Sequence, residues 1–243
     1  PPMNIFYIGM NNTIAPFDNE EVRQAFGMAI DRKRIVDTFY PVGSTVAEQF
    51  VPPMITPGYS EGQTWYAYDP TKAKQMLTDA GFDFNQEITL SYRDVVRVYL
   101  PNVNQVAQDI QAQLAEIGVK IKLNVMESGT FLTSVSDGKE GLFLLGWGAD
   151  YPDATNFYDF HFTGASKNFG TPFDDIVAAI REGGTTADPA ARQAAYDKVN
   201  ELLKQHVPMI PVAHGASGVA FKATVKDVKV GPLNENFEQM SID

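Results

Sequence analysis

The chain has 243 residues, of which 44% are hydrophobic, so it is long enough and apolar enough to bury a sizeable core. Its 30 acidic and 19 basic residues give a net charge of -11, which argues against a nucleic-acid partner, because phosphate binding needs a basic surface. The sequence contains no cysteine, which excludes disulfides, thiolate metal ligands and cysteine nucleophiles. It also contains no run of 18 apolar residues, so we expect no membrane-spanning helix.

Expected strands and helices alternate along most of the chain. Short apolar or alternating runs bounded by turn residues predict strands at 3–10, 87–92, 119–126, 141–147 and 209–213. Apolar residues at helical spacing predict helices at 22–30, 32–39, 70–80, 103–117, 172–181 and 188–205, and a short helix capped by Ser128. Asp69 and Asp188 each precede a proline and predict helix N-caps. This order predicts an α/β fold with a mixed central sheet and helices on both faces.

Two further segments are less regular. Residues 41–68 are rich in proline, glycine and aromatic residues, and a loop of this length is typical of a functional or covering segment. Residues 219–230 contain spaced valines and predict one or two more strands.

Few residues point to catalysis. The sequence has no G-x-S-x-G elbow, P-loop or dinucleotide-binding motif, so we predict no nucleotide cofactor and no serine nucleophile. The three histidines, His161, His206 and His214, are too far apart to predict a metal site, and we expect each to be structural or at the surface. Asp150 and Asp153 could form the acid pair of a glycoside hydrolase, which is the alternative function from another class.

The most informative stretch is residues 146–157. A buried strand ends there in Trp147, and Asp150 follows three residues later. Ligands of open α/β sheets bind beyond the carboxyl ends of strands, where an aromatic wall and a fixed carboxylate suit a cationic, partly apolar ligand. The alternative is that Trp147 belongs to the core and Asp150 caps the following helix.

Five segments, in order, resemble the solute-binding proteins of peptide-type ABC transporters. Residues 147–157 match that family's pattern W-x-A-D-Y-P-D-P-x-N-F, except that Ala154 replaces the usual proline. The other four matching segments are 17–32, 68–81, 111–119 and 188–206. The resemblance therefore covers nearly the whole chain.

The resemblance implies one lobe of a two-lobed clamshell, because family members are about twice as long. It implies that residues 1–215 form the second ligand-binding lobe and that residues 216–243 return to a missing N-terminal lobe. It further implies that the chain is part of a binding protein and not of an enzyme. The implied location is periplasmic or extracellular, where the full-length parent could be held by a lipid anchor. The implied partners are a peptide and an ABC transporter permease. No nucleic-acid partner is implied, and the chain is not expected to span a membrane. The alternative cargo is an oligosaccharide or a metal chelate.

The resemblance also assigns the binding residues. Asp150 corresponds to the aspartate that holds a peptide's α-ammonium group, next to Trp147. Independently of the resemblance, the loop that follows strand 87–92 also lies beyond a strand end, so Arg93, Arg97 and Tyr99 are further candidate ligand contacts. The alternative is that these three are solvated loop residues. Tyr151 is also a candidate contact, and the aromatic residues Trp65, Tyr66, Trp147 and Tyr151 would suit the sugar rings of the alternative cargo.

Overall fold

A computed structural model describes residues 2–218, 220–228, 231, 238 and 240–242. The strands are β1 (Asn4–Met10), β2 (Thr45–Val46), β3 (Glu87–Arg93), β4 (Lys120–Met126), β5 (Leu142–Gly148), β6 (Met209–His214), β7 (Val225–Lys226) and β8 (Ser241–Ile242). The helices are α1 (Glu20–Ala29), α2 (Arg32–Phe39), α3 (Pro70–Asp79), α4 (Val103–Glu116), α5 (Ser128–Ser136), α6 (Ala154–Phe162), α7 (Asp174–Thr185) and α8 (Pro189–His206).

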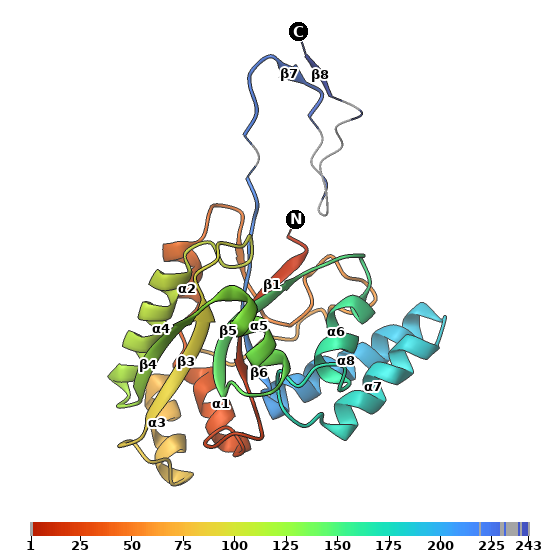
Figure 1. Ribbon diagram of the computed structural model, residues 1–243. Helices are drawn as coiled ribbons and strands as arrows, with labels where there is room; N and C mark the ends of the chain where they lie inside the picture. Colours follow the sequence, from red (N-terminus) through yellow and green to blue (C-terminus); the bar gives the residue numbers. More distant parts are fainter. Residues whose placement is uncertain (1, 219, 229–230, 232–237, 239, 243) are drawn as a thin grey trace.

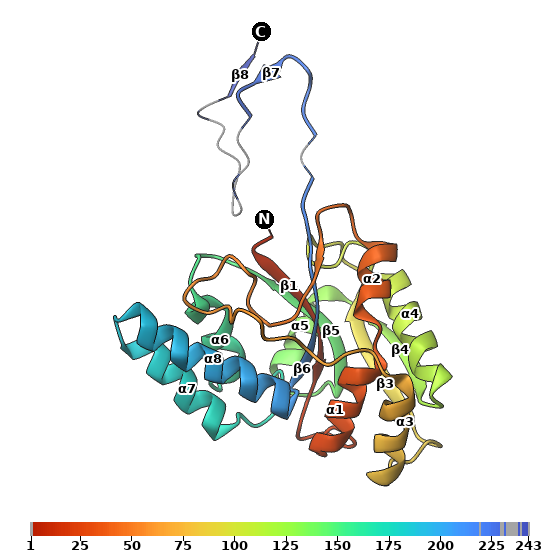
Figure 2. The same cartoon turned by 180° about the vertical axis from the view of Figure 1, so that it is seen from behind.

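A mixed six-stranded sheet forms the centre of the molecule, as the sequence predicts. The strand order is β2-β6-β1-β5-β3-β4, with β3 parallel to β4 and β5, and β1 antiparallel to β5 and β6. Helices α1 to α4 gather on one side of the molecule and α6 to α8 on the other (Figures 1 and 2). Every residue of β1 and β6 is buried. Since side chains of a strand alternate between faces, both faces of the sheet are covered here.

The sheet opens between β3 and β5. These two strands pair only at Leu90 with Leu142 and at Ser91 with Phe143, whereas β1 follows β5 over its full length. The ring of Tyr99, from the loop after β3, packs into the gap against Gly146. A Cβ atom on residue 146 would lie 2.3 Å from Cδ2 of Tyr99, so only glycine fits this approach.

Helix starts are mostly where the sequence predicts them. The carboxylates of Asp69 and Asp188 accept hydrogen bonds from the backbone N–H groups of Lys72 and Ala191, at 2.9 and 2.8 Å, so both are N-caps. The prediction for Ser128 is wrong, because the N-cap of α5 is Glu127. Ser128 is the first helical residue instead, and its hydroxyl accepts a hydrogen bond from Arg93.

Both ends of helix α7 differ clearly from prediction. Helix α7 begins two residues later than the predicted 172–181 and ends four residues later, at Thr185. Phe173 serves as its N-cap residue without a side-chain bond, so no capping signal marked the start.

The long segment 41–68 is a covering segment. It packs against α8 through Ser60, whose hydroxyl donates to Asp197 Oδ1 at 2.5 Å, and it buries Phe50, Val51 and Ile55. Trp65 is only 5% exposed, and the hydroxyl of Tyr66 donates to the backbone oxygen of Lys204. The ring of Trp65 is therefore closed to a ligand, whereas the ring of Tyr66 is partly exposed.

After Gly215 the chain leaves the rest of the molecule. We call residues 2–215 the body and the described residues between 216 and 242 the arm. Asn4 bonds both the N–H and the C=O of Gly215, each at 2.8 Å, and so holds the end of the body. The arm then extends away to the short β7–β8 pair (Figures 1 and 2). The strand predicted for 219–230 is therefore reduced to Val225–Lys226 among the described residues, and positions 219, 229 and 230 lie outside them.

Candidate functional site

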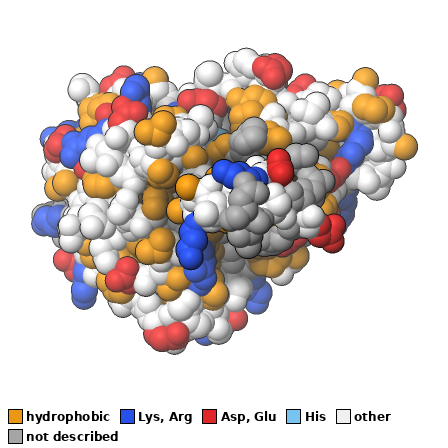
Figure 3. All heavy atoms as spheres, turned by 90° about the horizontal axis from the view of Figure 1, so that it is seen from above, with side chains coloured by type: hydrophobic (Ala, Val, Ile, Leu, Met, Phe, Trp, Pro, Cys, Tyr) orange, Lys and Arg blue, Asp and Glu red, His pale blue; other side chains and the backbone are white. Residues whose placement is uncertain are grey.

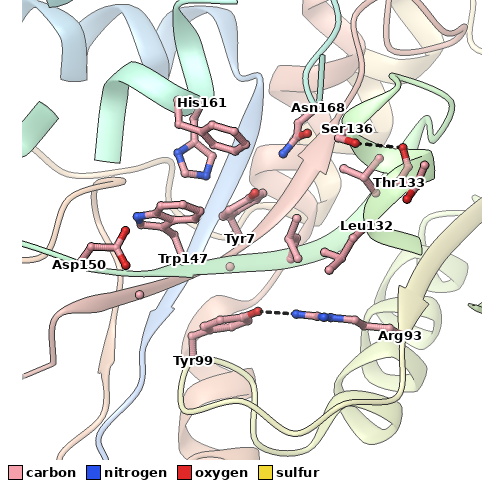
Figure 4. Close-up of a pocket in the computed structure, with 15 residues that line it drawn as sticks. Tyr7, Arg93, Tyr99, Leu132, Thr133, Ser136, Trp147, Asp150, His161 and Asn168 are labelled. Carbon is pink, nitrogen blue, oxygen red and sulfur yellow. Dashed lines mark hydrogen bonds between the residues drawn. The ribbon is translucent and has the colours of Figure 1, made fainter. Parts of the chain in front are cut away.

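A cavity of about 500 Å³ lies at the carboxyl ends of β3 and β5, where these strands separate. Residues from both strands, from β1, α5 and α6, and from three loops enclose it (Figure 4). They are Tyr7, Arg93, Tyr99, Leu132, Thr133, Val135, Ser136, Leu145, Gly146, Trp147, Gly148, Asp150, Phe160, His161 and Asn168. The position agrees with the rule that α/β sheets bind ligands beyond strand ends.

Trp147 forms one wall of the cavity and is not a fully buried core residue. Its ring stacks on Phe160 with centroids 5.4 Å apart and planes 18° from parallel. The indole N–H donates to Asn156 Oδ1 at 3.0 Å. The ring is thus fixed in place while one part of it faces the cavity, as Figure 4 shows.

Asp150 is held beside this wall by the same asparagine. Its backbone N–H donates to Asn156 Oδ1 at 3.1 Å, and its carboxylate accepts from Asn156 Nδ2 at 3.3 Å. Within the described part of the chain, no Lys, Arg or His nitrogen lies within 4 Å of this exposed carboxylate. The alternative that Asp150 caps α6 is wrong, since Asp153 is the N-cap and accepts from the N–H of Thr155 at 3.0 Å.

Arg93 and Tyr99 form the opposite part of the lining. The guanidinium of Arg93 donates to the hydroxyl of Ser128 at 2.8 Å and to that of Tyr99 at 3.4 Å. No carboxylate among the described residues lies within 4 Å of it. The cavity therefore has an acidic group, Asp150, and a basic group, Arg93, neither of them neutralised by an ion pair.

Two of the six predicted contacts do not line this cavity. Tyr151 is 48% exposed, and its hydroxyl lies 3.4 Å from that of Thr155. Arg97 is exposed, and its guanidinium donates to the adjacent carbonyl of Val96 at 3.2 Å. Both belong to surface turns whose direction sequence spacing does not reveal.

The sequence analysis missed the inner part of the cavity, which Tyr7, His161 and Asn168 form. All three side chains are buried. Tyr7 lies within a buried, largely apolar strand and His161 within a helix rich in aromatic residues, so local sequence gave no signal that distinguishes them from core residues. Burial raises the pKa of Tyr7 far above its usual value, and nearby Tyr99 adds to the rise. The amide of Asn168 lies close enough to the hydroxyl to offset the rise in part, although the two groups do not meet the geometry of a hydrogen bond.

His161 is neutral at physiological pH. Burial lowers its pKa to about 4, and the hydrogen bond with the carbonyl oxygen of Phe157, at 2.7 Å, opposes this only in part. Because a carbonyl can only accept, Nδ1 carries the proton and Nε2 is left as an acceptor.

The arrangement does not resemble a pair of catalytic acids. Arg192 bonds both carboxylate oxygens of Asp153 at 3.0 Å. Partial burial acts to raise the pKa of Asp153, but bonds from Thr155 and Arg192 outweigh it and hold that pKa below its usual value. Asp153 therefore remains ionised and caps a helix, whereas a general acid needs a raised pKa.

The described residues contain neither a candidate metal site nor a helix that could span a membrane. No group of three or more histidine and acidic side chains there is arranged to hold a metal ion. Within the same residues, none of the helices combines the length and the apolar character needed to cross a bilayer.

Comparisons with known proteins agree with this architecture. The family described as bacterial extracellular solute-binding proteins, family 5 Middle, matches residues 1–169. The dipeptide-binding protein of Escherichia coli is 31% identical over all of this chain, and heme-binding protein A of Haemophilus influenzae is 31% identical over 99% of it. A crystal structure of the dipeptide-binding protein of Pseudoalteromonas sp. SM9913 with Met-Leu superposes with a TM-score of 0.87 at 28% identity, over the whole chain.

The chain spans about half the length of these relatives. It covers 46% of the Escherichia coli protein, 45% of the Haemophilus influenzae protein and 49% of the Pseudoalteromonas chain. These proteins are named for binding, not for catalysis.

Proposed function

This chain belongs to the bacterial extracellular solute-binding proteins of family 5, and we propose that it is one ligand-holding lobe of a protein that delivers short peptides to an ABC transporter permease. The observation that carries the proposal is the cavity at the ends of β3 and β5, with an unpaired carboxylate and an unpaired guanidinium. A short peptide is a zwitterion, so its two termini complement these two charges. Such delivery takes place outside the cytoplasm, and it requires no catalytic group.

Asp150 is the proposed partner of the peptide's α-ammonium group. Asn156 bonds both Asp150 and the indole of Trp147, so the carboxylate is oriented before the ligand arrives. Preorganisation of this kind lowers the entropy lost on binding. Arg93, steadied by Ser128 and Tyr99, is the proposed partner of the peptide's carboxylate.

The face from which the arm leaves is the proposed contact with the other lobe. The loops that flank the start of the arm carry the exposed residues Val42, Val96 and Val98, which are 103%, 68% and 48% exposed. Figure 3 looks down on this face, where apolar side chains are spread among charged ones. Closure of a second lobe would cover these side chains and bury the peptide.

The proposal is tested by titrating this chain with Ala-Ala and with N-acetyl-Ala-Ala. The readout is the NMR signal of the Trp147 indole N–H, identified by its loss in Trp147→Phe. We expect weak binding of Ala-Ala, well above micromolar Kd, because one lobe supplies only part of the contact area. Asp150→Asn should weaken Ala-Ala binding about fivefold, since a solvent-exposed ion pair contributes about 1 kcal/mol. It should leave the acetylated peptide unaffected.

Asp153→Asn is the matched control, because it removes a nearby carboxylate that does not line the cavity. It should leave the preference for the free amino group unchanged. Equal binding of the free and acetylated peptides would contradict the ammonium contact. Sub-micromolar binding by this chain would contradict the need for a second lobe, and hydrolysis of the peptide would contradict a purely binding role.

Haemin is the second ligand to test, because a relative named for heme binding is as similar to this chain as the one named for dipeptides. Haemin is a metal chelate with two carboxylates and no ammonium group, so Asp150→Asn should not weaken its binding. A change in haemin absorbance on mixing, with no response to Ala-Ala, would replace peptide by haemin as the cargo.

A further inference from the structure

The inner part of the cavity contains buried polar atoms that lack partners. Tyr7 Oη and Asn168 Oδ1 are both buried, and neither has a hydrogen-bond partner among the described residues. Such atoms are rare in folded proteins, because each one loses its bonds to water and gains none in return. Figure 4 shows both side chains, with the imidazole of His161, around the same part of the cavity.

The three side chains together offer donors and acceptors but no charge. A tyrosine hydroxyl donates and accepts, and an asparagine amide does both as well. His161 contributes an acceptor at Nε2, since Nδ1–H donates to the Phe157 carbonyl. No lysine, arginine, aspartate or glutamate belongs to this inner part, because the charged residues of the lining are Arg93 and Asp150.

The position relative to Asp150 identifies the part of the ligand concerned. In Figure 4 Trp147 lies between Asp150 and the inner group formed by Tyr7, His161 and Asn168. The α-ammonium group and the first side chain of a peptide branch from the same Cα atom. An ammonium group held by Asp150 therefore leaves the first side chain free to pass along Trp147 toward Tyr7.

We infer that Tyr7, Asn168 and His161 form a subsite that selects peptides whose first side chain is uncharged and carries a hydrogen-bond donor and acceptor, such as an amide or a hydroxyl. This inference rests on the proposed peptide-binding function. An amide or hydroxyl satisfies the orphan atoms, whereas an aliphatic side chain leaves them buried without partners. A charged side chain of the same size loses its hydration without gaining an opposite charge.

Three dipeptides with first side chains of similar size test the inference, namely Asn-Ala, Leu-Ala and Asp-Ala, with Ala-Ala as the reference. Affinities for this chain are read from the Trp147 indole signal. We expect Asn-Ala to bind about fivefold more tightly than Leu-Ala, the effect of one neutral hydrogen bond, and Asp-Ala to bind most weakly. Ala-Asn and Ala-Leu carry the same two side chains at the second residue, so their affinities should differ by less than about twofold.

Tyr7→Phe and Asn168→Leu should each reduce the preference for Asn-Ala over Leu-Ala to below about twofold. Two variants are used so that the failure of one to fold leaves the other. Tyr158→Phe is the matched control, because it removes a buried tyrosine hydroxyl that bonds Asn200 outside the cavity. This control should keep the preference of the unmodified chain.

The outcomes separate the two proposals. Binding of Ala-Ala without any preference for Asn-Ala, or a preference that survives both variants, would overturn the subsite and leave the peptide-binding function intact. Absence of binding by Ala-Ala and by all the other dipeptides would overturn the peptide-binding function, and the subsite with it.

Discussion

Two buried polar clusters in this molecule differ in how completely their hydrogen bonds are satisfied. Around α8, Asn200 accepts from the hydroxyl of Tyr158 at 2.7 Å and donates to Gly58 O and Ser60 Oγ at 2.9 and 2.8 Å. In the cavity, the buried oxygens of Tyr7 and Asn168 have no partner among the described residues. Both clusters were built from the same residue types, tyrosine and asparagine. A cluster whose hydrogen bonds are satisfied stabilises the fold, whereas the unsatisfied oxygens beside the cavity are the ones that we propose bind a ligand.

The largest expected effect comes from breaking the satisfied cluster. Asn200→Ala would leave Tyr158, Gly58 and Ser60 without this buried partner, so we expect the free energy of unfolding to fall by about 3 kcal/mol. Urea denaturation followed by circular dichroism measures this loss. Asn12→Ala is the control, because Asn12 also makes two reciprocal bonds, both with Thr171, but in a solvent-exposed place. Asn12→Ala should lower the free energy of unfolding by less than about 1 kcal/mol. An equal loss in both variants would contradict the claim that burial makes the Asn200 bonds more important for stability.

A smaller effect is expected from removing one hydroxyl in each cluster. Tyr158→Phe leaves Asn200 Oδ1 without its donor and should lower the unfolding free energy by about 1 kcal/mol. Tyr7→Phe removes an oxygen that has no partner, so the unfolding free energy should stay within about 0.5 kcal/mol or rise. Thermal unfolding of the two variants side by side measures the difference. If Tyr7→Phe proved the more destabilising change, Tyr7 would belong to the fold and not to a binding site.

The smallest effect concerns the contrast between Asp150, which lines the cavity, and Asp153, which caps a helix. The pKa of Asp153 is lowered in the folded chain, so protons bind more tightly to the unfolded chain. Ionised Asp153 therefore stabilises the folded chain above the pKa that Asp153 has in the unfolded chain. This stabilisation is lost as the pH falls from about 5 through the lower pKa of Asp153 in the folded chain. Asp153→Asn should flatten this part of the stability curve, as measured by urea midpoints between about pH 6 and 3. Arg192→Gln should flatten it in part, because it removes the ion pair but leaves the bonds from Thr155.

The sequence predicted the framework of the fold well where local patterns carry the information. The structure confirms the first strand of the chain, β1, and the α/β class of the fold. It also confirms the two aspartates that cap helices before prolines. Errors arose where the local signal was weak, as at the start of α7, which has no side-chain cap. They also arose in the arm, where Val225–Lys226 is the part of the predicted strand 219–230 that forms a strand among the described residues.

The candidate site was only partly predictable. Trp147 lies near the end of β5 and Asp150 follows that strand closely, so their place at the sheet edge could be inferred from their position in the chain. Arg97 and Tyr151 lie in turns that direct them away from the cavity, and no sequence spacing encodes that direction. Tyr7 and Asn168 are 161 positions apart in the numbering and meet only through the sheet and the loop after α6.

The sequence by itself therefore determined the order and type of the elements, since hydrophobic periodicity, proline and capping residues act over a few positions. It also determined the family, through motifs that each lie within one short segment. Only the tertiary structure decided that β3 and β5 separate and that Asn156 holds Trp147 and Asp150 together. It also decided that the side-chain oxygens of Tyr7 and Asn168 have no hydrogen-bond partner in the part of the chain that the structure describes. The physical reason is that burial and hydrogen-bond satisfaction depend on which distant segments pack together, and local sequence does not specify that packing.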